Sequence, residues 1–172
     1  MAQYNTALFG LTETNLEWNR YKNQSIMKAV LNKHFKQSIM TTSTSKLHFP
    51  EDYKQGGTCT VITNNWSGRV LQYVSDDIGQ GRWSGMVIRA HWFNVAIITA
   101  YQVTQSAIEQ AGPTTAYAQQ WAVMRHNGAN RPEPRSQFIQ DIKRILKQLK
   151  RDGTKIILMM DANKQWEKTN KE

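Results

Sequence analysis

Four polar residues with the chemistry of a hydrolytic site stand close to the ends of apolar segments. Glu13, Tyr101 and Asp161 each end a run of mostly apolar residues, and Asn163 follows two positions after Asp161. Residues at strand ends project beyond the rim of a sheet, where ligands gather in many open α/β sheets. Any one of them could simply terminate a strand, but the set together indicates a site.

These residue types suit the metal-dependent hydrolysis of a phosphodiester. Magnesium prefers oxygen ligands, usually one or two carboxylates together with water and substrate phosphate. Glu13 could supply such a ligand, and Asp161 could orient or deprotonate an attacking water. Asn163 could hydrogen-bond to the scissile phosphate without repelling it. Metal and donors together would stabilise the charge that develops in the transition state.

The elements that must position these residues form alternating helical and extended segments. Strands are predicted from alternation, β-branched residues and glycine turns, over residues 8–13, 38–45, 58–63, 70–76, 85–90 and 94–101. Gly56-Gly57 is interpreted as a backbone turn, because no Gly-Lys-Ser/Thr follows it as a phosphate-binding loop requires. The order of elements predicts α/β layers around a mostly antiparallel sheet core.

Three helices and a last strand complete the prediction. The first helix covers about 16–35. The second, about 114–126 with Tyr117, Trp121 and Met124 on one face, lies in a long insertion at 102–135. The third begins with Ser136 as its cap and has an apolar stripe. A buried strand over 155–160 follows it.

Composition favours one globular domain with a polyanionic partner. The chain has 172 residues, enough for a sizeable core, and its formal charge of +9 favours polyanionic partners. One cysteine, Cys59, excludes an internal disulfide and is expected to be an inert core thiol. The N-terminus lacks the pattern of a signal peptide, and no apolar run is long enough to span a bilayer. An intracellular location is expected.

Several arginines and tryptophans are further candidates for nucleic-acid contact. Contact with phosphate would give affinity and salt dependence rather than sequence reading, and the candidates are Arg69 and Arg82 beside glycine turns and Arg131 and Arg135 beside the long insertion. The basic helix at 136–151 could track a phosphate backbone or form a solvated face. For Trp66, Trp83 and Trp92, burial between the sheets is favoured over stacking on bases.

The ordered motifs resemble those of the endonuclease/exonuclease/phosphatase superfamily, which includes DNase I-like nucleases and the endonucleases of retrotransposons. The resemblance covers most of the chain and rests on LTETNLEW, QGGTCTVI, RWSGMVIRA, IITAY and ILMMDAN. It implies a four-layer α/β sandwich with two packed sheets, Mg²⁺ or Mn²⁺ as the metal, and nucleic acid, in particular DNA, as the partner. A nuclear location would fit the endonuclease of a retrotransposon-like element.

The resemblance also assigns roles to the four residues. Glu13 matches the metal-binding glutamate, Asp161 and Asn163 match the catalytic Asp-x-Asn pair, and Tyr101 matches a tyrosine that faces substrate phosphate. Met160 stands where the family usually has glycine.

Two expected parts of the family pattern have no counterpart in this chain. They are an initial strand that carries an asparagine and a final Ser-Asp-His motif, so residues 1–172 are interpreted as a single domain truncated at both ends, with incomplete sheets. Three hypotheses follow: a nucleic-acid phosphodiesterase, a phospholipid or inositol phosphate phosphatase of the same superfamily, and an inactive nucleic-acid-binding fragment.

Overall fold

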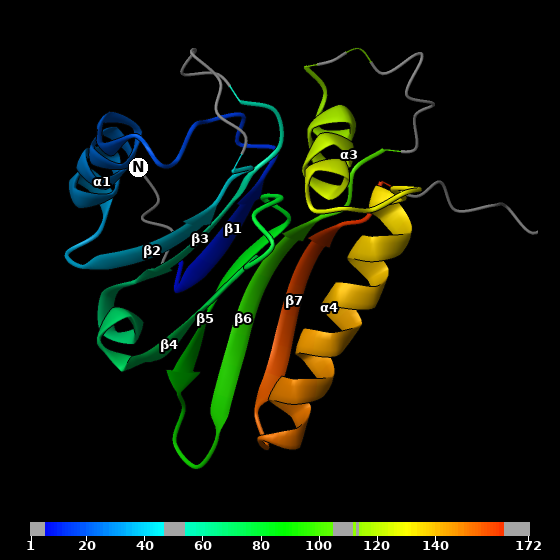
Figure 1. The fold of residues 1–172 in the computed structure, drawn as a ribbon. Helices are drawn as coiled ribbons and strands as arrows, with labels where there is room; N and C mark the ends of the chain where they lie inside the picture. The colour runs from blue at the N-terminus through cyan, green and yellow to red at the C-terminus, as the bar shows by residue number, and fades with distance from the viewer. Residues whose placement is uncertain (1–5, 47–53, 105–111, 113, 164–172) are drawn as a thin grey trace, which may run out of the picture.

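The computed structural model describes residues 6–46, 54–104, 112 and 114–163. They form two β-sheets with helices on their outer sides (Figure 1). In chain order the elements are β1 (Leu8–Thr12), α1 (Tyr21–His34), β2 (Ser38–Ser43), β3 (Thr58–Thr63), the 3-10 helix η1 (Asn64–Arg69), β4 (Val70–Ser75), β5 (Trp83–Arg89), β6 (Asn94–Tyr101), α3 (Ala116–His126), α4 (Pro134–Arg151) and β7 (Lys155–Asp161).

The first sheet has three antiparallel strands in the order β1-β3-β2. Its central strand β3 has the sequence TCTVIT, and all six of its residues are buried. Such a strand, paired on both edges and covered on both faces, suits β-branched residues that pack on a pleated surface. The prediction of a strand over 58–63 is confirmed.

The second sheet has four strands in the order β4-β5-β6-β7. Its first two pairings are antiparallel, and β7 adds to β6 in parallel. A parallel pair needs a long crossover connection, and here that connection contains α3 and α4. A mostly antiparallel core in a mixed α/β fold is therefore confirmed.

The two sheets pack against each other through one face of each. Alternation along β6 sends Ile97 to this interface, where Ile62 from β3 and Met86 from β5 meet it. A buried hydroxyl group lies among them, since Thr60 Oγ1 donates to Thr99 Oγ1 at 2.7 Å. The period of two along each strand explains why neighbouring residues serve different layers.

Each outer face is covered by one helix. Leu31 of α1 packs with Cys59 and Val61 on the first sheet, and Phe138 and Ile142 of α4 pack on the second. The layer order is therefore α1, the three-stranded sheet, the four-stranded sheet and α4. Burial raises the pKa of the Cys59 thiol to about 12, which agrees with the predicted inert core thiol.

Two helices begin at other residues than predicted. α1 begins at Tyr21 rather than near residue 16, because Trp18 is buried in the core and Glu17 pairs with the buried Lys54 before the helix starts. α4 begins at Pro134 rather than at a Ser136 cap. Proline is favoured in the first turn because the N–H that it lacks would have no helical partner there.

The strand over 155–160 is not buried as predicted. β7 is an edge strand, and none of its residues is fully buried. Ile157 and Met160 are among the exposed large apolar side chains. An apolar run identifies a strand but cannot distinguish a central strand from an edge, because that depends on which neighbours pair with it.

The tryptophans and α3 also depart from prediction. Of the three tryptophans predicted to lie between the sheets (Trp66, Trp83 and Trp92), only Trp83 is buried, and it lies under α4 instead. Trp66 is partly exposed, and Trp92, at the tip of the β5–β6 hairpin, is 92% exposed. In α3 the buried residues are Gln119, Gln120, Val123 and Met124, so Tyr117 and Trp121 lie at the margin of the inward face. None of the helices in the described ranges has the length and apolar character of a membrane span.

Candidate active site at three strand ends

The ends of β1, β6 and β7 bring three of the predicted site residues together. The parallel register of β6 and β7 places Tyr101 opposite Asp161. Glu13 follows β1 directly, and the Tyr101 hydroxyl donates to Glu13 Oε1 at 2.5 Å. Residues 88 positions apart in the chain thus meet at one rim, as their positions at strand ends predicted.

Gly10 allows β1 to approach the second sheet closely enough for this contact. A Cβ atom at position 10 would lie 2.2 Å from Thr99 Oγ1 and 2.9 Å from Met159 Cε. Any larger residue would force the Thr99 and Met159 side chains, or β1 itself, to shift. Glu13 stands three residues further along, so this close approach sets its distance from Tyr101.

A reciprocal pair of hydrogen bonds fixes the turn after Glu13. The Asn15 N–H donates to the Gly56 carbonyl at 2.8 Å, and the Gly56 N–H donates to Asn15 Oδ1 at 2.9 Å. Gly56 and Gly57 both have positive φ, at 78° and 83°, which glycine adopts without a steric penalty. Gly56-Gly57 is therefore a backbone turn, as predicted, and it also positions the segment that carries Glu13.

Asp161 and Asn163 belong to one short hydrogen-bonded turn. The Asn163 N–H donates to Asp161 Oδ1 at 3.1 Å, and Asn163 Nδ2 donates to the Gln102 carbonyl at 2.9 Å. Both Glu13 and Asn163 have positive φ, at 49° and 43°. Non-glycine residues rarely occupy this region, and such residues concentrate at functional sites.

Arg135, in the first turn of α4, forms hydrogen bonds to the segments that follow β6 and β7. Its guanidinium donates to the Val103 carbonyl, to Gln102 Oε1 at 3.1 Å and to the Asn163 carbonyl at 3.4 Å. Arginine suits this task because its five N–H donors form a rigid planar fork. In the structure Arg135 holds the turn that carries Asp161, and its predicted contact with nucleic acid stays a prediction.

Burial and two carboxylates set the electrostatic environment of Tyr101 at the rim. The pKa of Tyr101 is raised well above its ordinary value, first by burial, then by the hydrogen bond and negative charge of Glu13, and finally by the charge of Asp161. Tyr101 is 4% exposed, whereas Glu13 is exposed and Asp161 is partly buried. Within the described residues, no lysine, arginine or histidine pairs with either carboxylate.

No protein-family model matches the chain, and no curated protein matches it in sequence. The rim must therefore be interpreted from its own geometry. Among the residues that the structure describes, no group of three or more His, Cys, Asp or Glu side chains could hold a metal ion. Two carboxylates are within the number that Mg²⁺ takes from protein, since it keeps several waters.

The other predicted arginines do not join this rim. Arg82 is fully buried and binds Asp76 and Asp141, each at 2.9 Å, so its predicted role in phosphate contact is wrong. Arg69 is exposed on η1, which follows the end of β3 opposite to the one beside Glu13 (Figure 1). Arg131 is exposed in the segment just before α4, where its prediction stays open.

Three residues of the site were not predicted. Gln102 and Asn15 act through hydrogen bonds to partners 33 or more positions away, and Gly10 acts through a close contact between the sheets. Gln102 carried one signal, because it directly follows Tyr101. Nothing in the local sequence distinguishes Asn15 or Gly10, since their partners are chosen by strand packing.

Proposed function

We propose that this rim catalyses the metal-dependent hydrolysis of a phosphodiester in nucleic acid. One observation carries the proposal: two carboxylates from distant segments lie near the Tyr101 hydroxyl, and neither forms a salt bridge within the described residues. Glu13 is solvated, but its hydrogen bond to the buried Tyr101 gives this exposed carboxylate a fixed orientation. Oriented carboxylates beside residues with positive φ are expected at a metal or catalytic site.

The residues present fit a hard divalent cation such as Mg²⁺ or Mn²⁺. Glu13 is exposed at the rim, so one of its oxygens can reach a hydrated ion while Oε1 accepts from Tyr101. Asp161 is the second oxygen donor of the pair. When bound, the ion would stabilise the negative charge that develops on the phosphoryl oxygens.

The chain's own side chains divide the remaining work. Asp161 is positioned to accept a proton from an attacking water, because its Oδ1 is fixed by the Asn163 N–H. Tyr101 orients Glu13 rather than the substrate, since its proton is committed to that carboxylate. Asn163 donates one of its two amide hydrogens to Gln102, which leaves the second for a phosphate oxygen.

The layer order supports the same family proposal. Two packed sheets between α1 and α4 are what a DNase I-like sandwich would require. We propose on this ground, together with the ordered motifs, that the chain is related to the endonuclease/exonuclease/phosphatase superfamily. A phospholipid or inositol phosphate substrate remains the alternative within that superfamily.

A second candidate is binding of nucleic acid without hydrolysis. It is favoured by the donors at the rim, because the Tyr101 hydroxyl and one Asn163 N–H already have protein partners. In addition, no histidine among the described residues hydrogen-bonds to Glu13 or Asp161. A general acid for the leaving group is therefore not evident at this rim.

Plasmid nicking tests the proposal directly. Wild-type protein is expected to nick supercoiled DNA with Mg²⁺ and to stop when EDTA is added. Asp161→Asn keeps the shape of the side chain but removes its basicity, so the rate should fall by about 10²- to 10⁴-fold. Parallel assays with a phosphoinositide test the alternative substrate.

Asp152→Asn is the matched control. Asp152 is an exposed acid just before β7, at the end of the strand opposite to Asp161. Its variant should nick at the wild-type rate. Nicking that survives Asp161→Asn would remove the proposed role of that residue, and salt-sensitive binding without nicking would favour the second candidate.

A further inference from the structure

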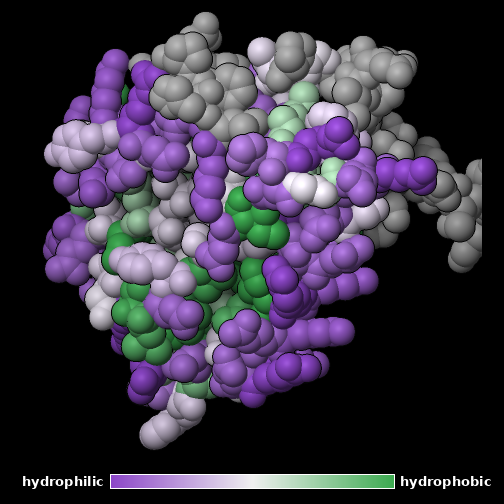
Figure 2. All heavy atoms as spheres, in the orientation of Figure 1, coloured by the Kyte–Doolittle hydropathy of each residue, from purple (hydrophilic) through white to green (hydrophobic). Residues whose placement is uncertain are grey.

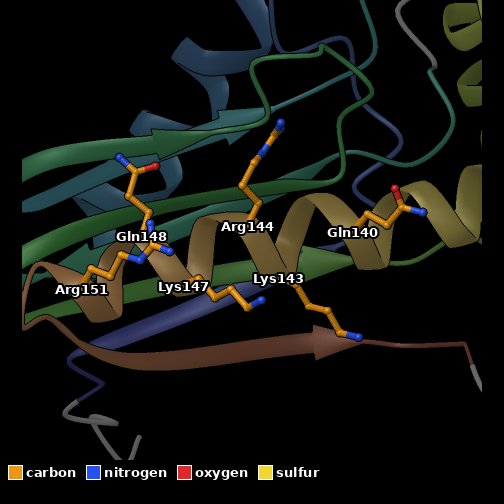
Figure 3. A pocket seen from close by; sticks show the side chains of 6 residues that line it. All are labelled: Gln140, Lys143, Arg144, Lys147, Gln148 and Arg151. Atoms are coloured by element: carbon orange, nitrogen blue, oxygen red, sulfur yellow. The ribbon is translucent and has the colours of Figure 1, made fainter.

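Four cationic side chains share the outward face of α4, at a distance from the strand ends. They surround a shallow hollow of about 490 Å³ together with two glutamines, and the six lining residues are Gln140, Lys143, Arg144, Lys147, Gln148 and Arg151. All six are exposed. Figure 3 shows Arg144 and Gln148 reaching to one flank of the helix and Lys143 and Lys147 to the other.

The spacing of these cations matches a phosphate backbone. A helix rises 1.5 Å per residue, so Lys143 and Arg151 are about 12 Å apart along the axis of α4. One strand of B-DNA carries a phosphate about every 3.4 Å along its axis, so this length spans three to four phosphates. Arg144 also pairs with Asp141 at 3.2 Å, which leaves Lys143, Lys147 and Arg151 as the stronger candidates for contact.

α4 presents these cations on a fixed support. Its apolar stripe, including Phe138 and Ile142, is buried against the second sheet. Asp141, on the same helix, is bound by the buried Arg82. A preorganised surface loses less conformational entropy on binding than a flexible one.

The buried stripe also argues against a membrane as the partner. Amphipathic helices bind membranes by placing their apolar face among the lipids, and the apolar face of α4 already packs on the sheet. Figure 2 shows hydrophilic side chains gathered over α4, with a hydrophobic area beside them toward β4. The cationic face can therefore offer electrostatic contact, and the apolar residues of α4 itself are not available for insertion into lipid.

The lining of the hollow favours a duplex over a single strand. Proteins that bind single strands without sequence preference stack the bases on aromatic side chains. The lining contains only glutamine, lysine and arginine. The hollow itself can contact phosphates but contains no aromatic side chain on which bases could stack.

We infer that this face of α4 docks the phosphate backbone of duplex nucleic acid, an inference that rests on the proposed function for its choice of polyanion. α4 runs from Arg135, which holds the Asp161 turn, so the cations begin about 12 Å from that level along the helix axis. A duplex that lies along α4 would thus be led toward the strand ends. The contact is independent of sequence and depends on salt.

A salt titration of duplex binding tests the inference. The anisotropy of a labelled duplex of about 20 base pairs, longer than α4, gives the dissociation constant at several salt concentrations. Replacing Lys143, Lys147 and Arg151 with glutamine removes three charges and keeps good helix formers. The slope of log K against log salt should become shallower by about 2.7, and affinity at low salt should fall at least about tenfold.

A second triple variant separates this face from net charge. Lys28→Gln, Lys33→Gln and Lys36→Gln remove the same charge from exposed positions in and just after α1, on the other outer layer. Its slope should change by less than about 1. Equal changes in both triple variants, or none in either, would overturn the inference. So would binding to equimolar phosphatidylcholine–phosphatidylserine vesicles that exceeds binding to the duplex.

The same set of proteins keeps the inference distinct from the proposed hydrolysis. Asp161→Asn should bind the duplex with the wild-type slope, because Asp161 is not part of the α4 face. Wild-type hydrolysis of bis(4-nitrophenyl) phosphate, a small phosphodiester that cannot reach along α4, tests the rim alone. Failure of that assay with a normal salt slope would reject the proposed hydrolysis and retain the docking surface.

Discussion

Two clusters of charged residues in this molecule differ in burial and in the pairing of their charges. At Arg82, one guanidinium lies between Asp76 and Asp141, and all three side chains are buried and hydrogen-bonded. Glu13 and Asp161, in contrast, lie near a tyrosine at a rim that is open to solvent, and neither forms a salt bridge within the described residues.

The backbone differs between the clusters as well as the charge. Arg82 connects the β4–β5 segment to α4. Its guanidinium also lies 4.4 Å from the centroid of the neighbouring Trp83 ring. At the rim, Glu13 and Asn163 adopt positive φ. A compensated, buried cluster cannot lose one partner without destabilising the fold, whereas carboxylates without a salt bridge beside residues with positive φ are expected to act on something else. The formal charges alone, which the sequence shows equally at both places, do not distinguish them.

The largest difference in stability between the two clusters is expected when Arg82 is removed. Arg82→Met leaves Asp76 buried without its cation and leaves Asp141 with only the exposed Arg144, so the free energy of unfolding should fall by about 3–5 kcal/mol. Urea denaturation at neutral pH measures the change. Arg69→Met makes the same substitution at an exposed arginine and should cost less than about 1 kcal/mol, the worth of its contact with Trp66. Similar losses of stability in both variants would show that the fold depends on the buried Arg82 no more than on the exposed Arg69.

A loss of stability at alkaline pH should reveal the raised pKa of Tyr101 beside Glu13. Because burial and Glu13 raise the pKa of Tyr101 above its ordinary value of 10.0, the folded protein holds the phenolic proton more tightly than the unfolded chain does. This contribution to stability is complete below about pH 10 and is lost as pH rises, at about 1.4 kcal/mol per pH unit.

Tyr101→Phe isolates that contribution from other groups that titrate in the same range. Urea unfolding at about pH 9 and about pH 11 should show a shallower loss of stability in the variant than in the wild type. Parallel losses in the two proteins would mean that Tyr101 does not carry the raised pKa.

The smallest effect on stability is expected from Glu13→Gln. Glu13 is exposed, and the amide oxygen can still accept from Tyr101, so the free energy of unfolding should change by no more than about 0.5 kcal/mol. Adding Mg²⁺ should stabilise the wild type, because a ligand that binds only the native state favours it, and should stabilise the variant less. A loss as large as that of Arg82→Met would make Glu13 a structural residue.

Much of the fold was predictable because its signals are local. The runs TCTVIT and NVAIITAY predicted β3 and β6 at their observed bounds. Residues at the ends of such runs, Glu13, Tyr101 and Asp161, were placed at a rim for the same reason. Helix starts were less certain, since the burial of Trp18 and the preference of Pro134 for a first turn decided them.

The sequence by itself determined which segments are strands and helices and which polar residues end them. Only the tertiary structure decided that Tyr101 lies opposite Asp161, that Arg82 is buried while Arg135 holds a turn, and that β7 is an edge. The physical reason is the distance along the chain over which each interaction acts. Alternation and capping act over a few residues, whereas strand register and charge pairing join positions as far apart as 59 for Arg82 with Asp141 and 88 for Tyr101 with Glu13.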